Sequence, residues 1–256
     1  MNNITITLEK VSKNYHTKTE EIVAVKDISF TVNTGEFVSL VGPSGCGKST
    51  ILSMIAGLFP PSEGIIMIDD QIVEGPSRKI GYMLQQDYLL KWRTIEDNIF
   101  LGLEIQGRLD SITKKHALYL LDEMGLSEYA KTYPNQLSGG MRQRVALVRT
   151  LATNPDILLL DEPFSALDYQ TKLKLEDLVA KTIKKHQKTA ILVTHDLGEA
   201  IAMSDRVIIL GKNPGYIKKI IEIPEFLRNT TPFLTREKPE FQTYFEMIWE
   251  EMDDHD

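Results

Sequence analysis

The chain has 256 residues, a formal charge of −7 at neutral pH and one cysteine, so it suits one large domain or one domain with an insertion. The lack of a basic block argues against a nucleic-acid partner, and a single cysteine excludes an intrachain disulfide. No apolar run reaches the ~18–20 residues of a membrane span, and the first residues do not resemble a signal peptide, so we expect a cytosolic protein whose membrane role, if any, comes through a partner.

The first 35 residues have the alternating pattern of β-strands. Apolar residues alternate with threonines from Ile4 to Leu8, and a second alternation runs from Ile28 to Val32 before a turn at 33–35. This period of two predicts two half-buried strands. Tyr15 lies between the two alternations.

The next stretch, 42–50, fits the pattern G-x-x-x-x-G-K-[ST] of phosphate-binding loops. A buried strand is predicted before it, over 36–41, and a helix after it, over 50–56. In this context glycines let backbone N–H groups face a phosphate, although a glycine-rich turn without a ligand is the alternative. Lys48 is expected to reach the β- and γ-phosphates, and the Ser49 hydroxyl to bind Mg²⁺. The loop consists of Gly42, Pro43, Ser44, Gly45, Cys46, Gly47, Lys48, Ser49 and Thr50. We also expect alkylation of Cys46 to block nucleotide binding and ATP to protect the thiol.

The middle of the chain changes from strand to helix patterns. Residues 64–68 and 80–84 predict two more strands, with a turn at 69–70. Helical spacing then runs from about 94 to 126, with Gly125 as a stop. We predict a helical insertion over about 86–145 and a basic-faced helix over 141–152.

Three apolar runs follow, over 157–160, 190–193 and 207–210. Short uninterrupted runs are typical of parallel strands that are buried on both faces. A helix is predicted between the first two runs, and strands alternating with helices predict an open parallel α/β sheet. Ligands of such sheets bind at the carboxyl ends of the strands. We therefore expect Lys48, Asp161, Glu162 and His195 to converge.

The C-terminal part, from Pro224 to Pro239, has no period and is predicted to be irregular. Helical spacing returns afterwards, with an acidic opposite face. We expect this helix to pack on the body of the protein rather than on an anionic membrane. The apolar positions are Phe241, Tyr244, Phe245, Ile248, Trp249 and Met252.

Two further groups of residues suit the binding or hydrolysis of a nucleotide. Asp161 and Glu162 follow the 157–160 run, and they suit a contact to Mg²⁺ and a general base for water that attacks a γ-phosphate. Ser138, Gly139 and Gly140 precede the basic-faced helix. They have the local chemistry of a second anion site, since a helix N-terminus offers unpaired N–H groups.

The stretch Leu137-Ser138-Gly139-Gly140 resembles the L-S-G-G-x signature of ABC transporter nucleotide-binding subunits. The resemblance covers about residues 4–215, with every family motif in order. It implies a P-loop NTPase fold with a RecA-like core of mostly parallel sheet, an N-terminal antiparallel β subdomain and an inserted α-helical subdomain. The implied ABC ATPase domain spans 4–240, with its core in 1–84 and 146–223 and the helical subdomain in 86–145. A C-terminal extension spans 224–256.

The resemblance assigns further site residues. Tyr15 matches the aromatic residue that stacks on adenine, with a merely packed tyrosine as the alternative. Gln85 matches the glutamine that touches Mg²⁺ or the attacking water, although Gln86 beside it leaves the register open. Asp168 matches a loop that crosses the dimer interface, and a helix N-cap is compatible with that role. His195 matches the switch histidine that contacts the γ-phosphate.

The resemblance also implies partners. Ser138 and Gly140 of one family subunit face the γ-phosphate held by Lys48 of the other, which implies a homodimer when ATP is bound with Mg²⁺. The family subunit works at the cytoplasmic face of the membrane under a polytopic permease, and indirectly with an extracellular solute-binding protein. Leu89, Leu90 and Trp92 are expected to be exposed apolar anchors for a helix of the permease.

The stretches 89–94 and 213–217 resemble importer subunits for nitrate, sulfonates and taurine. Those subunits usually have proline where this chain has Lys91. The implied function is an ATP-hydrolysing subunit that energises import of a small organic solute. Other cargo, such as a thiamine precursor, stays open. So does a soluble ATPase of the same type, as in iron–sulfur cluster assembly. A chromosome or DNA-repair ATPase is disfavoured because no sustained heptads occur, and intact Glu162 and His195 argue against a module without turnover.

Overall fold

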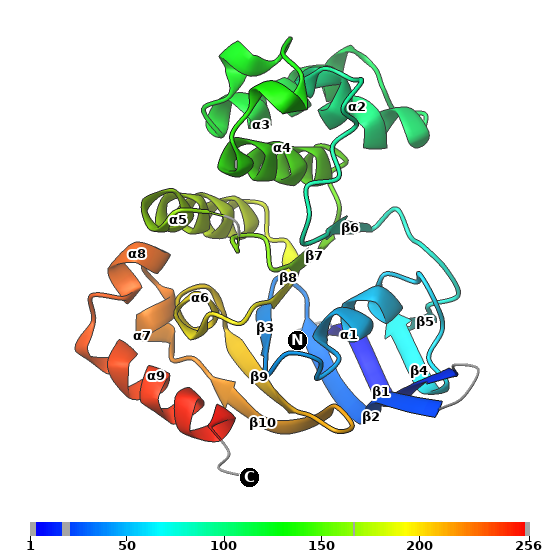
Figure 1. Cartoon of the computed structure of the whole chain (residues 1–256), viewed down its shortest axis with the longest axis vertical. Helices are drawn as coiled ribbons and strands as arrows, with labels where there is room; N and C mark the ends of the chain where they lie inside the picture. The colour runs from blue at the N-terminus through cyan, green and yellow to red at the C-terminus, as the bar shows by residue number, and fades with distance from the viewer. Residues whose placement is uncertain (1–3, 17–20, 166, 254–256) are drawn as a thin grey trace. The chain divides into compact units, whose positions relative to one another are not determined.

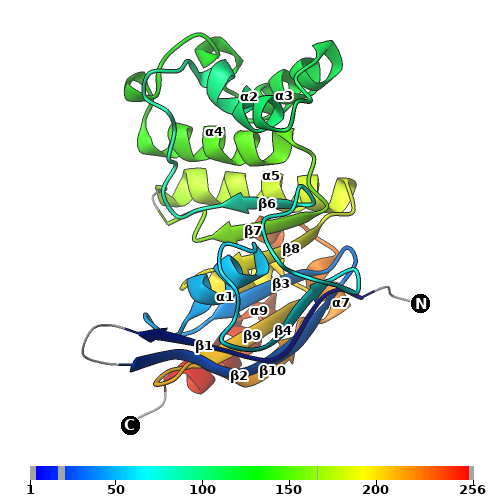
Figure 2. The ribbon, with the colours of Figure 1, turned by 90° about the vertical axis from the view of Figure 1, so that its right-hand side faces the viewer.

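The structure is a computed structural model that describes residues 4–16, 21–165 and 167–253. The chain folds into two compact units, one made of 1–77 with 176–256 and the other of 78–175. The elements of each unit can be followed in Figures 1 and 2.

An antiparallel sheet forms the N-terminal part of the first unit. It contains β1 (Ile4–His16), β2 (Glu21–Asn33), β4 (Glu63–Ile68) and β5 (Gln71–Ile72) in the order β2-β1-β4-β5. Side chains 28, 30 and 32 are buried, which confirms the predicted alternation of the second strand. The predicted turn between β4 and β5 is also present, since Asp69 and Asp70 both have positive φ, at 47° and 62°.

A second group of strands in this unit carries the phosphate-loop motif. It contains β3 (Phe37–Val41), β8 (Thr189–Val193), β9 (Arg206–Gly211) and β10 (Tyr216–Glu222). β3 pairs in parallel with β8 and with β9, and β10 pairs antiparallel with β9. Every residue of β3 and β8 is buried, as the apolar runs predicted. β10 is not apparent from the sequence, because its mostly exposed residues lack a clear apolar alternation.

Helices follow two of these strands. α1 (Lys48–Ile55) follows β3, and α6 (Leu197–Met203) follows β8. α1 begins two residues earlier than predicted, because Gly47 already adopts the N-cap position with φ at 92°.

The C-terminal part of the first unit is mainly helical, with short turns between its helices. The prediction that the stretch from Pro224 to Pro239 is irregular is wrong. It contains two short helices, α7 (Glu225–Arg228) and α8 (Pro232–Thr235), and α9 (Pro239–Met252) follows. A single turn is too short to show a helical period, and α8 is set by a proline in its first turn and a capping side chain at Thr231. α9 packs as expected on a core cluster that includes Leu197, Ile201, Ile209, Ile221 and its own fully buried Ile248. Of the predicted apolar positions, Trp249 is the exception, because it is 54% exposed.

The second unit is mostly helical. It contains the parallel strands β6 (Ile80–Met83) and β7 (Ile157–Asp161) and the helices α2 (Ile95–Ile105), α3 (Ser111–Glu123) and α4 (Gly139–Ala152). Short 3₁₀ turns span Ser127–Tyr129 and Pro134–Gln136. α5 (Tyr169–Lys185) begins in this unit and ends in the first. The unit 78–175 is larger than the predicted insertion 86–145 because it also takes in β6 and β7, and the predicted domain boundaries stay a prediction.

Across residues 4–16, 21–165 and 167–253, no helix has the length and apolar character of a membrane span.

Candidate active site

The phosphate-loop motif lies between β3 and α1. Gly42 and Gly47 have φ values of 154° and 92°, which L side chains rarely adopt. A Cβ on Gly47 would lie 2.2 Å from Cγ1 of Val25, and one on Gly42 would lie 2.6 Å from the carbonyl oxygen of Leu210. The loop therefore passes so close to β2 and β9 that only glycine fits at these two positions.

Lys48 is buried at the start of α1. Its ammonium donates to the carbonyl oxygens of Gly42 at 2.7 Å and Pro43 at 3.0 Å, which centres a positive charge in the loop. The N-cap residue of α1 is Gly47, which has no side chain to cap the helix. The first-turn N–H groups and the ammonium together suit a phosphate.

The environment of Cys46 argues against the expectation that its thiol is readily alkylated. The side chain is fully buried, and its sulfur lies 3.7 Å from the Lys48 ammonium. Burial raises the pKa of the Cys46 thiol more than the Lys48 charge lowers it. Because the thiolate is the reactive form, alkylation of the folded loop is disfavoured rather than expected.

Tyr15 lies on β1, near the phosphate loop. Lys13 of β1 pairs with Val25 of β2, and Val25 is the residue that would meet a Cβ on Gly47. Tyr15 is 39% exposed, and its ring meets Phe59 edge-on, with ring centroids 6.1 Å apart. An exposed aromatic face beside a phosphate loop is compatible with base stacking, and the adenine role stays a prediction.

His195 lies at the same end of the parallel strands as the phosphate loop. Leu40 of β3 pairs with Val193 of β8, and Gly42 and His195 each come two residues later. The imidazole is exposed. The register therefore places the loop and His195 at the carboxyl ends of adjacent strands, where ligands of such sheets bind.

The residues that flank His195 are fixed by hydrogen bonds. Thr194 is buried, and its hydroxyl donates to the carboxylate of Glu199. The Asp196 amide donates to that hydroxyl oxygen at 3.0 Å, and Asp196 caps α6 by accepting from the Glu199 amide at 3.1 Å. The backbone on both sides of His195 is thus anchored.

In the second unit, two predicted site residues follow the paired strands β6 and β7, just as Gly42 and His195 follow β3 and β8. Met83 pairs with Leu160, and Gln85 and Glu162 each follow two residues later. The Gln85 side-chain amide donates to the Glu162 carboxylate at 3.0 Å. It is therefore Gln85, not its neighbour Gln86, that meets this carboxylate.

Asp161 and Glu162 occupy different environments at the end of β7. Asp161 is buried as the last residue of the strand, whereas Glu162 is only partly buried. Glu162 has φ at 47°, an unfavourable conformation for a residue with a side chain. Such strain occurs preferentially at functional sites, where it fixes the direction of a side chain.

The segment after Gln85 is tied to the helices of the second unit. The Gln85 carbonyl accepts from the Gln143 side chain of α4 at 3.3 Å, and Asp87 pairs with Arg142 of the same helix at 2.9 Å. A movement of Gln85 would therefore reach α4.

The expected exposure of Leu89 is wrong, and Leu90 is only partly exposed. Leu89 is buried, with 7% of its surface exposed, whereas Trp92 is 75% exposed. Buried Asn98 of α2 accepts from the Leu90 amide at 2.7 Å and donates to the Leu90 carbonyl at 3.1 Å. These bonds draw the loop onto α2, whereas Trp92 stays exposed, and its role as an anchor for a partner stays a prediction.

The remaining predicted site residues lie at the N-termini of α4 and α5. Ser138 caps α4 by accepting from the Met141 amide at 3.3 Å, so Gly139 and Gly140 form the first turn of the helix rather than preceding it. Asp168 accepts from the Thr171 amide at 3.0 Å, which confirms the predicted cap of α5. Hydrogen bonds from the Thr171 side chain and backbone lower the pKa of the Asp168 carboxyl. The neighbouring Ala166 lies outside the described residues.

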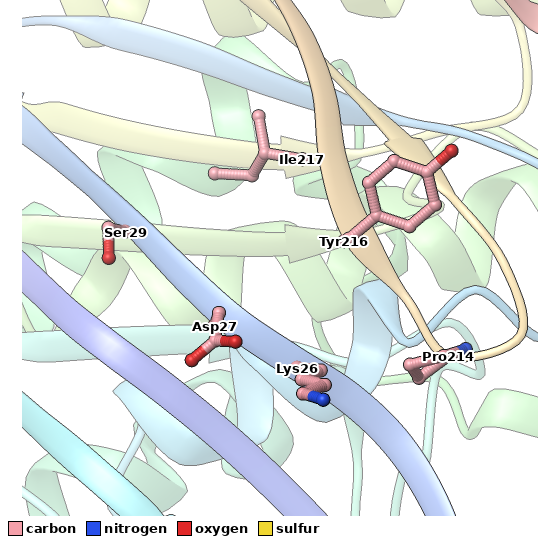
Figure 3. A pocket seen from close by; sticks show the side chains of 6 residues that line it. All are labelled: Lys26, Asp27, Ser29, Pro214, Tyr216 and Ile217. Carbon is pink, nitrogen blue, oxygen red and sulfur yellow. The ribbon is translucent and has the colours of Figure 1, made fainter.

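A cavity of about 370 Å³ lies between β2 and β10 (Figure 3). It is lined by Lys26, Asp27, Ser29, Pro214, Tyr216 and Ile217, none of which belongs to the predicted site. The predicted site therefore consists of residues at strand ends and helix starts rather than of residues lining this cavity.

Comparison with known sequences agrees with these motifs. The profile of the ABC transporter family matches residues 25–165. An uncharacterized ABC transporter ATP-binding protein of Bacillus subtilis is 54% identical over 245 residues, which are 96% of this chain and 94% of that protein. A nitrate import ATP-binding protein of Synechocystis is 42% identical over 90% of this chain and 88% of its own length. An aliphatic sulfonates import ATP-binding protein of Bacillus cereus is 40% identical over 86% of both chains.

Solved structures agree on the fold. A dimeric ATP-binding cassette in a post-hydrolysis state, bound to ADP and Pi, superposes with a TM-score of 0.78 at 36% identity. The match covers 86% of this chain and 100% of that one. The predicted P-loop NTPase fold, with parallel strands, an antiparallel sheet and helices, is thereby confirmed. By motif, fold and sequence, the chain belongs to the ABC transporter family, as an ATP-hydrolysing, ATP-binding subunit that resembles those of the nitrate and sulfonate importers.

Proposed function

We propose that this ATPase energises a membrane importer for a small organic solute of the nitrate, sulfonate or taurine kind. The observation that carries the proposal is the 40–42% identity to two import subunits over at least 86% of the chain.

The phosphate loop binds the nucleotide in this proposal. The ammonium of Lys48 and the N–H groups at the start of α1 neutralise the β- and γ-phosphates, and Tyr15 stacks on the adenine. The ammonium already lies within the loop, on the carbonyls of Gly42 and Pro43. A charge held in place loses little entropy when the nucleotide binds.

Glu162 is the general base. Its carboxylate accepts a proton from water as the water oxygen forms a bond to the γ-phosphorus and the bond to the bridging oxygen of ADP breaks. The Gln85 amide at 3.0 Å holds one carboxylate oxygen and orients the carboxylate. His195 contacts the γ-phosphate as a hydrogen-bonding partner.

Ser49, Gln85 and Asp161 would hold Mg²⁺. All three side chains offer oxygen, which is the donor that Mg²⁺ prefers, so the set fits this ion. Bound there, the ion would neutralise charge on the phosphates.

The working form in this proposal is a homodimer with ATP shared between protomers. Ser138, Gly139 and Gly140 at the start of α4 face the γ-phosphate held by the partner, and Asp168 lies at the interface. A shared nucleotide has differential affinity for the closed and open pair, so hydrolysis releases the pair. The solved cassette that this chain resembles is dimeric.

The dimer binds a polytopic permease at the cytoplasmic face of the membrane, and an extracellular solute-binding protein acts through that permease. Affinity purification from detergent extracts tests this proposal. We expect a polytopic membrane protein to co-purify with the chain. Recovery of soluble partners alone would favour an ATPase without a membrane partner.

Replacing the proposed base tests the chemistry. Glu162→Gln should reduce turnover by about 10²–10⁴-fold, the usual size of a general-base contribution. The amide is similar in shape, so ATP binding should persist and an ATP-bound dimer should accumulate on gel filtration. A variant that hydrolyses ATP at the wild-type rate would exclude Glu162 as the base.

A further inference from the structure

The segment that contains α8 lies outside the part of the chain matched by the family profile, which ends at residue 165. It nevertheless contacts α6, the helix that begins directly after His195. Arg236, the C-cap residue of α8, lies close to Gly198 of α6. This residue belongs to no motif considered so far.

Arg236 is held on one side by α5. Its guanidinium forms an ion pair of 2.6 Å with Glu176, whose side chain is fully buried. A buried carboxylate without its cation is strongly destabilising. A second contact fixes α8 to the same helix, because the Phe233 amide donates to Asp177 at 2.9 Å.

On its other side, Arg236 lies against the first turn of α6. A Cβ built on Gly198 would be 3.6 Å from Nε and 3.8 Å from Nη2 of Arg236, so the guanidinium lies beside this glycine. Gly198 lies within the hydrogen-bonded stretch 194–199 that flanks His195. The guanidinium therefore lies between a buried carboxylate of α5 and the backbone that carries the histidine.

We propose that Arg236 is a positioning residue for His195: paired with Glu176, it holds the first turn of α6 and so fixes the direction of the imidazole. This inference rests on the proposed role of His195 in ATP hydrolysis. A misplacement of about 1 Å can cost on the order of 10²-fold in rate. A loosened turn should therefore lower kcat while the phosphate loop still binds ATP.

The test compares variants of the pair with a control at the other end of α6. Arg228 of α7 pairs with Asp205, which lies two residues beyond the last residue of α6. Arg236→Gln should reduce kcat by roughly tenfold or more, with KM for ATP changed by less than about twofold. Arg236→Lys should recover part of the rate, because it keeps the charge. Arg228→Gln should keep the wild-type kcat.

A double variant keeps the test valid if Arg236→Gln fails to fold. Glu176→Leu with Arg236→Met removes both charges, and apolar replacement of both members of a buried pair is often tolerated. This variant should fold and still show the reduced kcat. Wild-type kcat in the folded double variant, or an equal loss of kcat in Arg228→Gln, would overturn the proposal.

A spectroscopic measurement separates this inference from the proposed chemistry. The His195 proton resonance, identified with a His195→Gln variant, should shift in Arg236→Gln and in the double variant but not in Arg228→Gln. An unchanged resonance in the double variant would overturn the positioning role. Wild-type turnover in His195→Gln would instead overturn the role of His195, while the resonance still reports on Arg236.

Discussion

At Gly47 two separate constraints act on one α-carbon. The backbone has φ at 92°, and a Cβ would lie 2.2 Å from the buried Val25. Gly45 in the same loop has φ at 81°, yet among the described residues no atom lies within 4 Å of its Cβ position. The two glycines therefore allow the cost of backbone strain to be separated from the cost of a steric clash.

Gly45→Ala should lower the free energy of unfolding by about 1–2 kcal/mol, the cost of a left-handed conformation for a residue with a Cβ. Gly47→Ala should cost roughly a further 1–3 kcal/mol, because the added methyl group displaces Val25 and β2. Urea unfolding of both variants measures the difference. Equal stability of the two variants would contradict the close packing of the loop on β2.

Single residues differ in how well their surroundings follow from the sequence. The pattern of the phosphate loop predicts where Lys48 lies, because the glycines and the following helix set the backbone locally. The burial of Leu89 depends instead on Asn98, nine residues later, whose side chain bonds to the backbone of Leu90. Cys46 likewise lies in a recognisable motif, but its burial results from packing that the motif does not encode.

The N-terminus of α5 shows how a helix start responds to pH. Asp168 caps the helix as a carboxylate, and hydrogen bonds from Thr171 lower the pKa of its carboxyl below the ordinary value of 3.8. Because the pKa is lower in the folded state, the cap stabilises the helix above pH 3.8 and is lost as the pH falls through the folded pKa.

We therefore expect the Thr171 amide resonance to move as the pH is lowered below 4, when the Asp168 carboxylate takes up a proton. In Asp168→Asn the side-chain oxygen caps the helix at any pH, so this resonance should stay constant. A wild-type Thr171 resonance that does not titrate would exclude capping by the carboxylate.

Strong patterns predict elements well, and weak ones do not. The short apolar runs became β3, β8 and β9, and the helical spacing near the C-terminus became α9, because burial follows the apolar residues there. β10 is missed because an edge strand carries exposed residues such as Lys219 and Ile220 at neighbouring positions. α7 and α8 are missed because one turn gives no period, and α4 begins two residues early because its cap is Ser138.

At the scale of the whole molecule, the proposed site is divided between protomers. Lys48 and Ser138 of one protomer would serve different nucleotides. Loss of either residue should inactivate a homodimer, since each of its two sites then lacks one part. A mixed dimer keeps one complete site.

Lys48→Ala and Ser138→Arg should each hydrolyse ATP very slowly when alone. An equal mixture should regain roughly a quarter of the wild-type rate, because half of the dimers are mixed and each of these has one complete site of two. Turnover in the mixture is the measurement. A mixture as slow as its components would contradict a site shared between protomers.

The bridge between Val25 and Gly215 has one further consequence. The Lys26 amide donates to the Gly215 carbonyl at 2.8 Å, and a Cβ on Gly215 would lie 2.1 Å from the carbonyl oxygen of Cys46. The seam between β2 and β10 therefore lies directly behind the phosphate loop. Nucleotide that tightens the loop should slow hydrogen–deuterium exchange at Lys26, which makes this amide an internal reporter of occupancy.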